Sequence, residues 1–179
     1  MADWTIIKIL SWTESYFKTI SGEPGSGSQS GTAARSVSRE PKTLKIDSPR
    51  LTAEILLAHT LGIERLDLYL QYDRPLEAKE LADYKACIKR RAAGEPVAYI
   101  TGVRGFYEDE FKVGKGVLIP RPDTETLVEE ALSWLAGSAG KQDCGEERKT
   151  VLELGVGSGA IIVSLAKAAP AHEYFACDI

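Results

Sequence analysis

Residues 150–163 read Thr150-Val-Leu-Glu153-Leu-Gly155-Val-Gly157-Ser-Gly159-Ala-Ile-Ile-Val163. A short apolar strand over 151–154 runs into a glycine loop, and the loop opens a helix that we expect over 160–168. A second apolar strand, over 174–177, is followed directly by Asp178. This order of strand, glycine loop, helix, strand and acidic residue is typical of a nucleotide-type cofactor site in a doubly wound parallel sheet. The segment therefore predicts an α/β fold and the βαβ beginning of a Rossmann-like unit.

The glycine loop fits two cofactor patterns. Read with Ala160 it is G-x-G-x-x-A, a weak dinucleotide fingerprint, and read with Glu153 it is E-x-G-x-G-x-G, a loop for S-adenosylmethionine. A dinucleotide presents a pyrophosphate to the helix N-terminus, where the carboxylate of Glu153 would repel it. S-adenosylmethionine has no phosphate but carries an ammonium, a sulfonium and a ribose diol, all of which favour acceptors or negative charge. The residues favour the methyl donor, with a dinucleotide or a purely structural glycine turn as alternatives.

The same chemistry assigns a role to each residue of the segment. Glycines let a backbone approach a ligand closely because they have no Cβ. Asp178 stands about twenty residues after the loop, where a carboxylate can accept hydrogen bonds from both ribose hydroxyls. The cofactor-binding residues predicted here are Glu153, Gly155, Val156, Gly157, Ser158, Gly159 and Asp178.

The composition excludes several functional classes. The net charge of −4 gives no basic footprint for nucleic acid, so we expect no direct nucleic-acid binding. Three cysteines, Cys87, Cys144 and Cys177, lie far apart and form no C-x-x-C pair, which supports neither a disulfide framework nor a metal site. No apolar run is long enough to cross a membrane. The N-terminus carries an early acid and no basic segment before a long apolar core, so we expect no secretory signal. We expect a cytoplasmic protein that does not bind membranes, and a monomer.

The N-terminal half predicts helices. Periodic apolar residues indicate a helix over 4–20 with Asp3 as its N-cap. Residues 21–43 are rich in glycine and serine and nearly lack large apolar side chains, so they predict a flexible insertion. We expect a helical domain over 1–95 that contains this insertion.

Caps and stops define the other helices of that domain. Ser48 suits an N-cap and Pro49 the first helical position, and Gly62 suits the C-terminal stop of this helix. Two further helices are predicted over about 64–71 and 77–93, the second ended by Gly94.

The pattern changes over 96–122. Short β-prone segments at 97–101, 105–107, 111–113 and 117–119 predict strands, with a hairpin through 108–110. We expect this stretch to be a β-hairpin linker. After it, Asp123 or Thr124 should cap a helix that ends near residue 136, with Leu127, Ala131 and Leu135 on its buried side. The Rossmann-like domain would then cover 123–179.

Two stretches carry a family resemblance. They are Arg90-Arg91-Ala-Ala-Gly94-Glu95-Pro96 and Ile119-Pro120-Arg121-Pro122-Asp123-Thr124-Glu125, and they are joined upstream by Ile46-Asp-Ser-Pro-Arg-Leu51-Thr-Ala-Glu54. With these, the chain resembles the release factor glutamine methyltransferase family (HemK/PrmC). The resemblance covers 46–179 nearly continuously and 4–20 more loosely.

The resemblance implies a helical N-terminal domain, a hairpin linker and a Rossmann-like methyltransferase domain. It implies S-adenosyl-L-methionine as cofactor and a peptide chain release factor as partner. The reaction would be methylation of the glutamine side-chain amide in the Gly-Gly-Gln motif of that factor. Thr124 and Glu125 would lie near the methionine end of the cofactor; alternatively, they are the N-cap and first-turn acid of their helix.

The chain departs from the family pattern in two places. One is the insertion at 21–43. The other is an Asn-Pro-Pro-Tyr segment, which in the family binds the acceptor amide, whereas this chain contains no asparagine. We therefore expect a truncated methyltransferase domain that is loosely packed and inactive alone. Two alternative functions are a release-factor-docking module that catalyses no reaction and a dinucleotide-binding protein.

Overall fold

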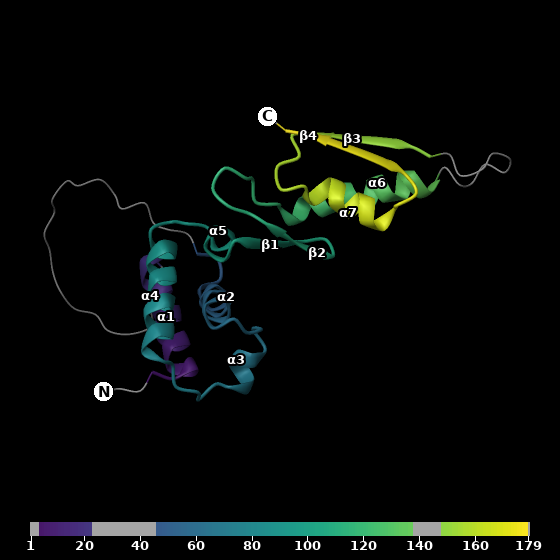
Figure 1. Ribbon diagram of the computed structural model, residues 1–179. Coiled ribbons are helices and arrows are strands. Elements are labelled where there is room, and N and C mark those ends of the chain that lie inside the picture. The colour runs from purple at the N-terminus through teal and green to yellow at the C-terminus, as the bar shows by residue number, and fades with distance from the viewer. Residues whose placement is uncertain (1–3, 23–45, 138–147, 179) are drawn as a thin grey trace, which may run out of the picture. The chain divides into compact units, whose positions relative to one another are not determined.

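The computed structural model describes residues 4–22, 46–137 and 148–178 (Figure 1). Within these residues the chain forms two compact units, divided between Thr101 and Gly102. Unit 1 is helical, and unit 2 combines helices with short strands. The mixed α/β class, with a helical N-terminal part followed by the start of a methyltransferase-like βα region, is as the sequence predicts. No helix in the described ranges has the length and apolarity needed to cross a membrane.

The described residues of unit 1 form five helices. They are α1 Ile6–Ile20, α2 Pro49–Leu61, α3 Asp67–Leu70, α4 Ala78–Ala92 and α5 Val97–Thr101. Ser48 and Pro49 begin α2 as predicted, and Gly62 ends it in the left-handed conformation at φ 65°. A reciprocal capping box between Glu77 and Glu80 begins α4. Local sequence signals thus set both ends of α2 and the start of α4.

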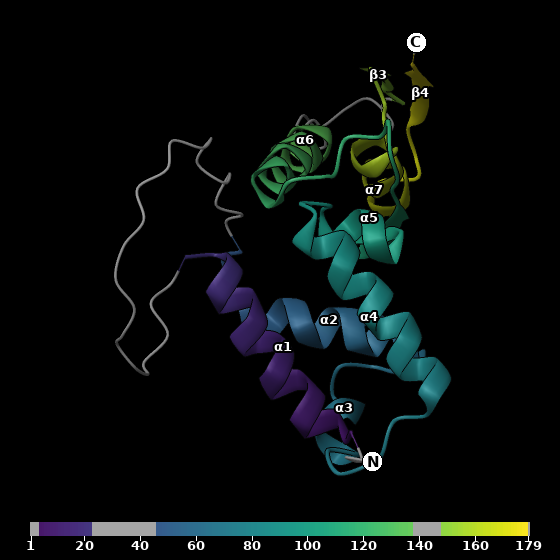
Figure 2. The same ribbon diagram turned by 90° about the vertical axis from the view of Figure 1, so that its left-hand side faces the viewer.

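The helices α1, α2 and α4 pack together around one apolar core (Figure 2). Tyr84 of α4 is fully buried there, and its hydroxyl donates a hydrogen bond of 3.1 Å to the carbonyl of Ala53. This bond gives a partner to the only polar side-chain atom of a large buried residue and so offsets the cost of removing its hydroxyl from water. The fully buried apolar side chains around it include Ile6, Phe17, Leu56, Leu57 and Leu68.

A buried carboxylate joins α2 to the segment that carries α3. Glu54 is 2% exposed, and its Oε1 accepts hydrogen bonds from Arg50 Nε at 2.7 Å and from the hydroxyl of Tyr69. Its Oε2 accepts a third from Arg65 Nη2 at 3.3 Å. Burial alone would raise the pKa of Glu54, but the hydrogen bonds from Tyr69 and Arg50 outweigh it and lower the pKa below its ordinary value.

We expect Glu54→Gln to destabilise unit 1 by about 2 kcal/mol near neutral pH, because it weakens charge-assisted hydrogen bonds in a buried place. A carboxyl group whose pKa is lowered in the folded state stabilises that state above its unfolded pKa, and this stabilisation is lost as the pH falls through the folded pKa. The difference between wild type and Glu54→Gln should therefore shrink below about pH 4.

Urea unfolding followed by tryptophan fluorescence measures this effect. In a Trp134→Phe background, the signal comes from Trp4 and Trp12, which both lie in unit 1. The exposed Glu64 provides a matched control, and Glu64→Gln should leave stability unchanged. A difference between wild type and Glu54→Gln that does not vary with pH would contradict the role of the charge.

Two strand predictions in the connecting region are wrong. Residues 97–101 form the helix α5, in which the amides of Tyr99 and Ile100 donate to the carbonyl of Pro96. Arg90 forms two hydrogen bonds of 2.7 Å with Glu95 and donates a third to the carbonyl of Tyr99. These bonds from α4 outweigh the β-propensity of the segment. Residues 117–119 form no strand either, and Leu118 and Ile119 instead line a pocket.

Unit 2 contains a hairpin, two helices, a 3₁₀ turn and a two-stranded parallel sheet. The strands are β1 Val103–Phe106, β2 Asp109–Lys112, β3 Thr150–Leu154 and β4 Glu173–Cys177, and the helical elements are η1 Pro122–Thr124, α6 Glu125–Gly137 and α7 Ala160–Ala168. The hairpin is confirmed, but its turn lies one to two residues earlier than predicted, at Tyr107 and Glu108, since Phe106 pairs with Asp109. The parallel pairing of β3 with β4 across α7 is confirmed.

The helices α6 and α7 lie between the β3–β4 sheet and the β1–β2 hairpin (Figure 1). Phe106 and Phe111 of the hairpin, Val128 of α6, and Ala160 and Leu165 of α7 form the core of the unit. The sheet face away from the helices is open among the described residues. The side chains exposed on it are Leu152 at 61%, Leu154 at 72% and Phe175 at 55%.

The start of α6 corrects a further prediction. Asp123 and Thr124, either of which was expected to cap the helix, belong to a 3₁₀ turn that Pro122 begins directly before it. Of the residues predicted for its buried side, Leu135 is buried and Ala131 packs against the core, but Leu127 is 55% exposed and Val128 is fully buried instead. The predicted helix over 64–71 is also shorter, covering only α3. Asp3 and nearly all of the insertion at 21–43 lie outside the described residues.

Candidate cofactor site

The glycine loop joins β3 to α7 in a conformation that requires glycine. Gly155, Gly157 and Gly159 have φ angles of 76°, 53° and 78°, in the left-handed region that other L-residues rarely adopt. The amides of Gly155 and Val156 donate to the carbonyl of Cys177 at 2.8 and 3.2 Å. The loop is therefore held against the end of β4, where Asp178 follows.

Both carboxylates predicted for the site accept hydrogen bonds from backbone amides of the loop and the helix. Asp178 Oδ2 accepts from the amide of Gly157 at 2.8 Å, and Glu153 Oε2 accepts from the amide of Ile162 at 3.0 Å. Burial raises the pKa of Glu153, and the hydrogen bond from Ile162 opposes this shift. The two strand ends thus place negative charge on either side of the loop.

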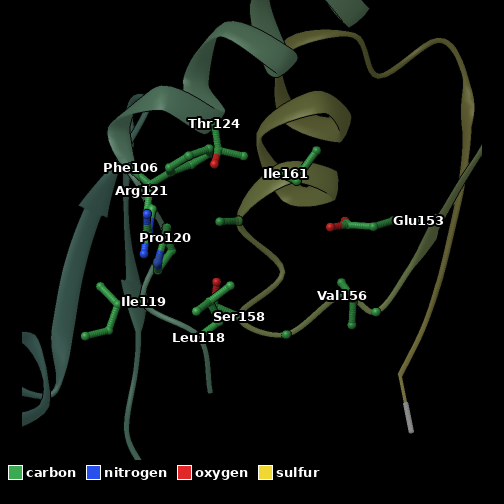
Figure 3. A pocket seen from close by; sticks show the side chains of 13 residues that line it. Phe106, Leu118, Ile119, Pro120, Arg121, Thr124, Glu153, Val156, Ser158 and Ile161 are labelled. Atoms are coloured by element: carbon green, nitrogen blue, oxygen red, sulfur yellow. The ribbon is translucent and has the colours of Figure 1, made fainter. Parts of the chain in front are cut away.

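A pocket that is partly open to solvent lies beside the loop (Figure 3). One wall comes from the loop and the start of α7, and the other from the segment that leads into α6. Apolar side chains make up much of the second wall. The lining residues are Phe106, Leu118, Ile119, Pro120, Arg121, Thr124, Glu153, Gly155, Val156, Gly157, Ser158, Ala160 and Ile161.

The structure brings most of the predicted site residues together at this pocket. Thr124, Glu153 and the loop residues 155–158 line it. Gly159 is the N-cap of α7, and Asp178 holds the loop by its bond to Gly157 rather than lining the pocket. Glu125 lies elsewhere: its Oε1 accepts a hydrogen bond of 3.2 Å from the amide of Tyr107.

Sequence reasoning missed much of the second wall. Phe106, Leu118, Ile119, Pro120 and Arg121 were not predicted to lie at the site, although all of them line the pocket. The signal that could have found them is the unusual Ile-Pro-Arg-Pro run directly before Thr124. Two prolines so close together prevent regular pairing, and such a segment is better suited to a pocket wall than to a strand.

Several backbone donors of the glycine loop, and the amide of Ile162 in α7, already have acceptors. A dinucleotide site offers such amides to a pyrophosphate. Here the amide of Ile162 donates to Glu153, that of Gly157 to Asp178, and those of Gly155 and Val156 to Cys177. A phosphate at this place would have to displace carboxylates of its own sign, so the loop disfavours an anionic ligand.

Comparisons with known proteins show the family of the chain. The family model described as PrmC N-terminal domain matches residues 32–102. A release factor glutamine methyltransferase of Rhodopirellula baltica is 36% identical over 176 residues, covering 98% of this chain and 50% of the relative. The chain belongs to the release factor glutamine methyltransferase family. Further members similar to it are those of Chlorobaculum tepidum, 45% identical over 135 residues, and Burkholderia pseudomallei, 48% identical over 128 residues.

These matches cover only part of the length of each relative. They cover 75% and 72% of this chain, but 45% and 42% of the two relatives. The chain thus spans about half the length of the curated family members it matches.

Among the described residues, no group of three or more histidine, cysteine, aspartate or glutamate side chains is placed to hold a metal ion.

Proposed function

We propose that the protein is an S-adenosylmethionine-dependent methyltransferase that acts on the glutamine side-chain amide in the Gly-Gly-Gln motif of a peptide chain release factor. The names of its relatives support the reaction class and the acceptor. The observation that carries the choice of methyl donor is the pair of carboxylates, Glu153 and Asp178, that flank the glycine loop. A cationic ligand without phosphate fits that charge.

The residues around the pocket fit the parts of the donor. Asp178 would accept hydrogen bonds from the ribose hydroxyls, and the left-handed glycines would allow close approach of the backbone. Glu153 uses Oε2 for Ile162, which leaves Oε1 for the cofactor's ammonium group. The wall formed by Phe106 and Leu118 would exclude water from the sulfonium side.

When bound, S-adenosylmethionine supplies a methyl group on a good leaving group, so catalysis depends mainly on positioning. The acceptor amide nitrogen is a poor nucleophile because its lone pair is delocalised into the carbonyl. A second set of acceptors must therefore grip the amide and orient it. The family pattern assigns this to Asn-Pro-Pro-Tyr, which these 179 residues lack. We assign the donor site to this chain and methyl transfer to the whole protein.

Docking of the release factor is proposed for unit 1. The family resemblance suggests it, and one surface supports it: Leu66, Tyr69, Leu70 and Tyr72, on and around α3, are all more than half exposed. Exposed apolar and aromatic side chains gathered on one element favour a protein partner. This surface also favours the second candidate function, a docking module that acts without chemistry.

Titration of the chain with S-adenosylmethionine and with NAD tests the donor assignment. We expect S-adenosylmethionine to bind at least about tenfold more tightly, because the loop carboxylates repel a pyrophosphate. Isothermal calorimetry measures both ligands under the same conditions. Tighter binding of NAD would overturn the methyltransferase proposal, and binding of a release factor without either ligand would favour the docking module.

A further inference from the structure

The hairpin between β1 and β2 turns at a residue with an unusual backbone. Tyr107 has a φ of 55° and is the only residue other than glycine with a positive φ in the described parts of the chain. It is the first residue of the two-residue turn that joins Phe106 to Asp109. Such turns usually place glycine, asparagine or aspartate at positive φ, because a Cβ makes this conformation unfavourable. Contacts outside the turn must therefore hold the tyrosine.

Tyr107 contacts the rest of unit 2 through its backbone and through its ring. Its amide, which lies beyond the last pair of the β1–β2 ladder, donates a hydrogen bond of 3.2 Å to Oε1 of Glu125. Its ring packs against the core of the unit. Glu125 is the first residue of α6, so the hydrogen bond fixes the hairpin turn to the start of this helix.

This hydrogen bond lies next to two residues that line the pocket. Phe106 directly precedes Tyr107, and Thr124 directly precedes Glu125. Figure 3 shows Phe106 and Thr124 on the same side of the pocket, across from Glu153. Phe106 belongs to β1 and Thr124 to η1, so neither element alone determines the distance between them. The bond between their neighbours limits how far they can move apart.

We propose that Glu125 is a positioning residue of the cofactor pocket, which through the amide of Tyr107 holds the ring of Phe106 in place before the cofactor binds. This inference rests on the proposed function and deepens it, because it names the contact that fixes one wall of the site. A wall that is fixed in advance loses less entropy on binding, so the contact contributes to affinity without touching the ligand. The strained backbone of Tyr107 is then part of the site, as strained residues often are.

A carboxylate in the first turn of a helix also has a general role. It interacts favourably with the partial positive charge of the helix N-terminus, whichever group it contacts. That role depends on the charge of Glu125, whereas the positioning role depends on the reach of its side chain to Tyr107. Two substitutions separate charge from reach. Glu125→Gln keeps the acceptor and removes the charge, and Glu125→Asp keeps the charge on a side chain that is one carbon shorter.

We expect Glu125→Asp to weaken S-adenosylmethionine binding about fivefold to tenfold, the effect of losing one hydrogen bond. Glu125→Gln should bind within about twofold of wild type, because an amide oxygen can still accept from Tyr107. The opposite order, with Glu125→Gln the weaker variant, is what the helix charge alone predicts. Calorimetry on variants that circular dichroism shows to be folded measures these affinities.

A substitution of Tyr107 tests whether the bond acts through the turn. Glycine adopts a φ of 55° without strain, so Tyr107→Gly should keep the turn when the bond is absent. In a Tyr107→Gly background, Glu125→Asp should therefore weaken binding by no more than about twofold. Asp123, an exposed acid directly before α6 that does not line the pocket, provides the control. Asp123→Ala should leave the affinity within about twofold of wild type.

Hydrogen exchange followed by mass spectrometry separates positioning from general support of the fold. In Glu125→Asp the peptide that contains Phe106 and Tyr107 should exchange faster, while peptides from α7 keep their wild-type protection. Equal loss of protection in α7 would mean that the bond supports the whole unit, and it would overturn the positioning role.

The outcomes distinguish this inference from the function on which it rests. If wild type binds S-adenosylmethionine and Glu125→Asp binds it equally well, or if Glu125→Gln loses as much affinity as Glu125→Asp, the positioning role is overturned and the methyl-donor site stands. If the wild-type chain, shown folded by circular dichroism, does not bind S-adenosylmethionine, both proposals are overturned. A loss in Glu125→Asp that the Tyr107→Gly background removes supports both.

Discussion

Replacing Phe106 with alanine is expected to lower the stability of unit 2 by about 3–5 kcal/mol, the usual cost of removing a large aromatic ring from a core. Phe106 is 2% exposed and contacts Phe111 edge to face, with 6.2 Å between the ring centroids. It also lines the cofactor pocket. The variant should therefore lose both the packing of α6 and α7 and the affinity for S-adenosylmethionine.

Hydrogen exchange followed by mass spectrometry measures this loss for each element. Peptides from α6 and α7 should exchange much faster in Phe106→Ala, while peptides from α2 and α4 of unit 1 should not change, because the two units have separate cores.

Two further variants make the Phe106 result specific. Phe106→Leu keeps most of the volume and should cost far less. Phe175→Ala removes the same atoms from an exposed place in the same unit and should have little effect. Equal protection of α7 in Phe106→Ala and in wild type would show that the hairpin does not support the helices.

Replacing Asp178 is expected to cause the greatest loss of cofactor affinity among the polar residues of the site. Its carboxylate accepts the amide of Gly157 at 2.8 Å, and we propose that it also accepts the ribose hydroxyls. Asp178→Ala removes both interactions and should weaken S-adenosylmethionine binding about a hundredfold, as expected for two or more charge-assisted bonds. Asp178→Asn keeps an acceptor for Gly157 and should lose only about tenfold.

Calorimetry with S-adenosylmethionine and with methionine alone tests the assignment of Asp178 to the ribose. Asp178→Ala should not change the weak binding of methionine, which has no ribose. Asp123, exposed in η1 and outside the pocket lining, provides the control, and Asp123→Asn should bind like wild type. Equal affinities of Asp178→Ala and Asp178→Asn would mean that the loss comes from the ribose contact and not from the loop.

The parts of the fold that local sequence controls could be predicted. The helix over 160–168 has the predicted bounds, because three glycines before it and an apolar face within it point to one structure. The start of α2 at Ser48 and Pro49 and its stop at Gly62 are of the same kind. Each of these signals acts over a few residues.

The features that the sequence did not predict depend on contacts between residues that are far apart in the chain. The helix α5 replaces a predicted strand because Arg90, nine residues away, donates to the carbonyl of Tyr99. For Glu125 the sequence offered a place near the cofactor or a first-turn acid of its helix; it lies in the first turn of α6, and its bond to the amide of Tyr107, eighteen residues upstream, is one that no local pattern indicated. The pocket wall at 118–121 was missed for the same reason. A sequence pattern predicts that a carboxylate or a guanidinium is present, but not which group it will contact.

The bonds that hold the glycine loop have a thermodynamic consequence. The loop is held by Asp178, which accepts from the amide of Gly157, and by the carbonyl of Cys177 at the end of β4, and both contacts require β4 to be paired with β3 in register. A ligand that needs this loop conformation binds only when β3 and β4 are paired. By linkage, binding of the ligand therefore stabilises the pairing of β3 with β4, and a ligand that binds more tightly stabilises it more.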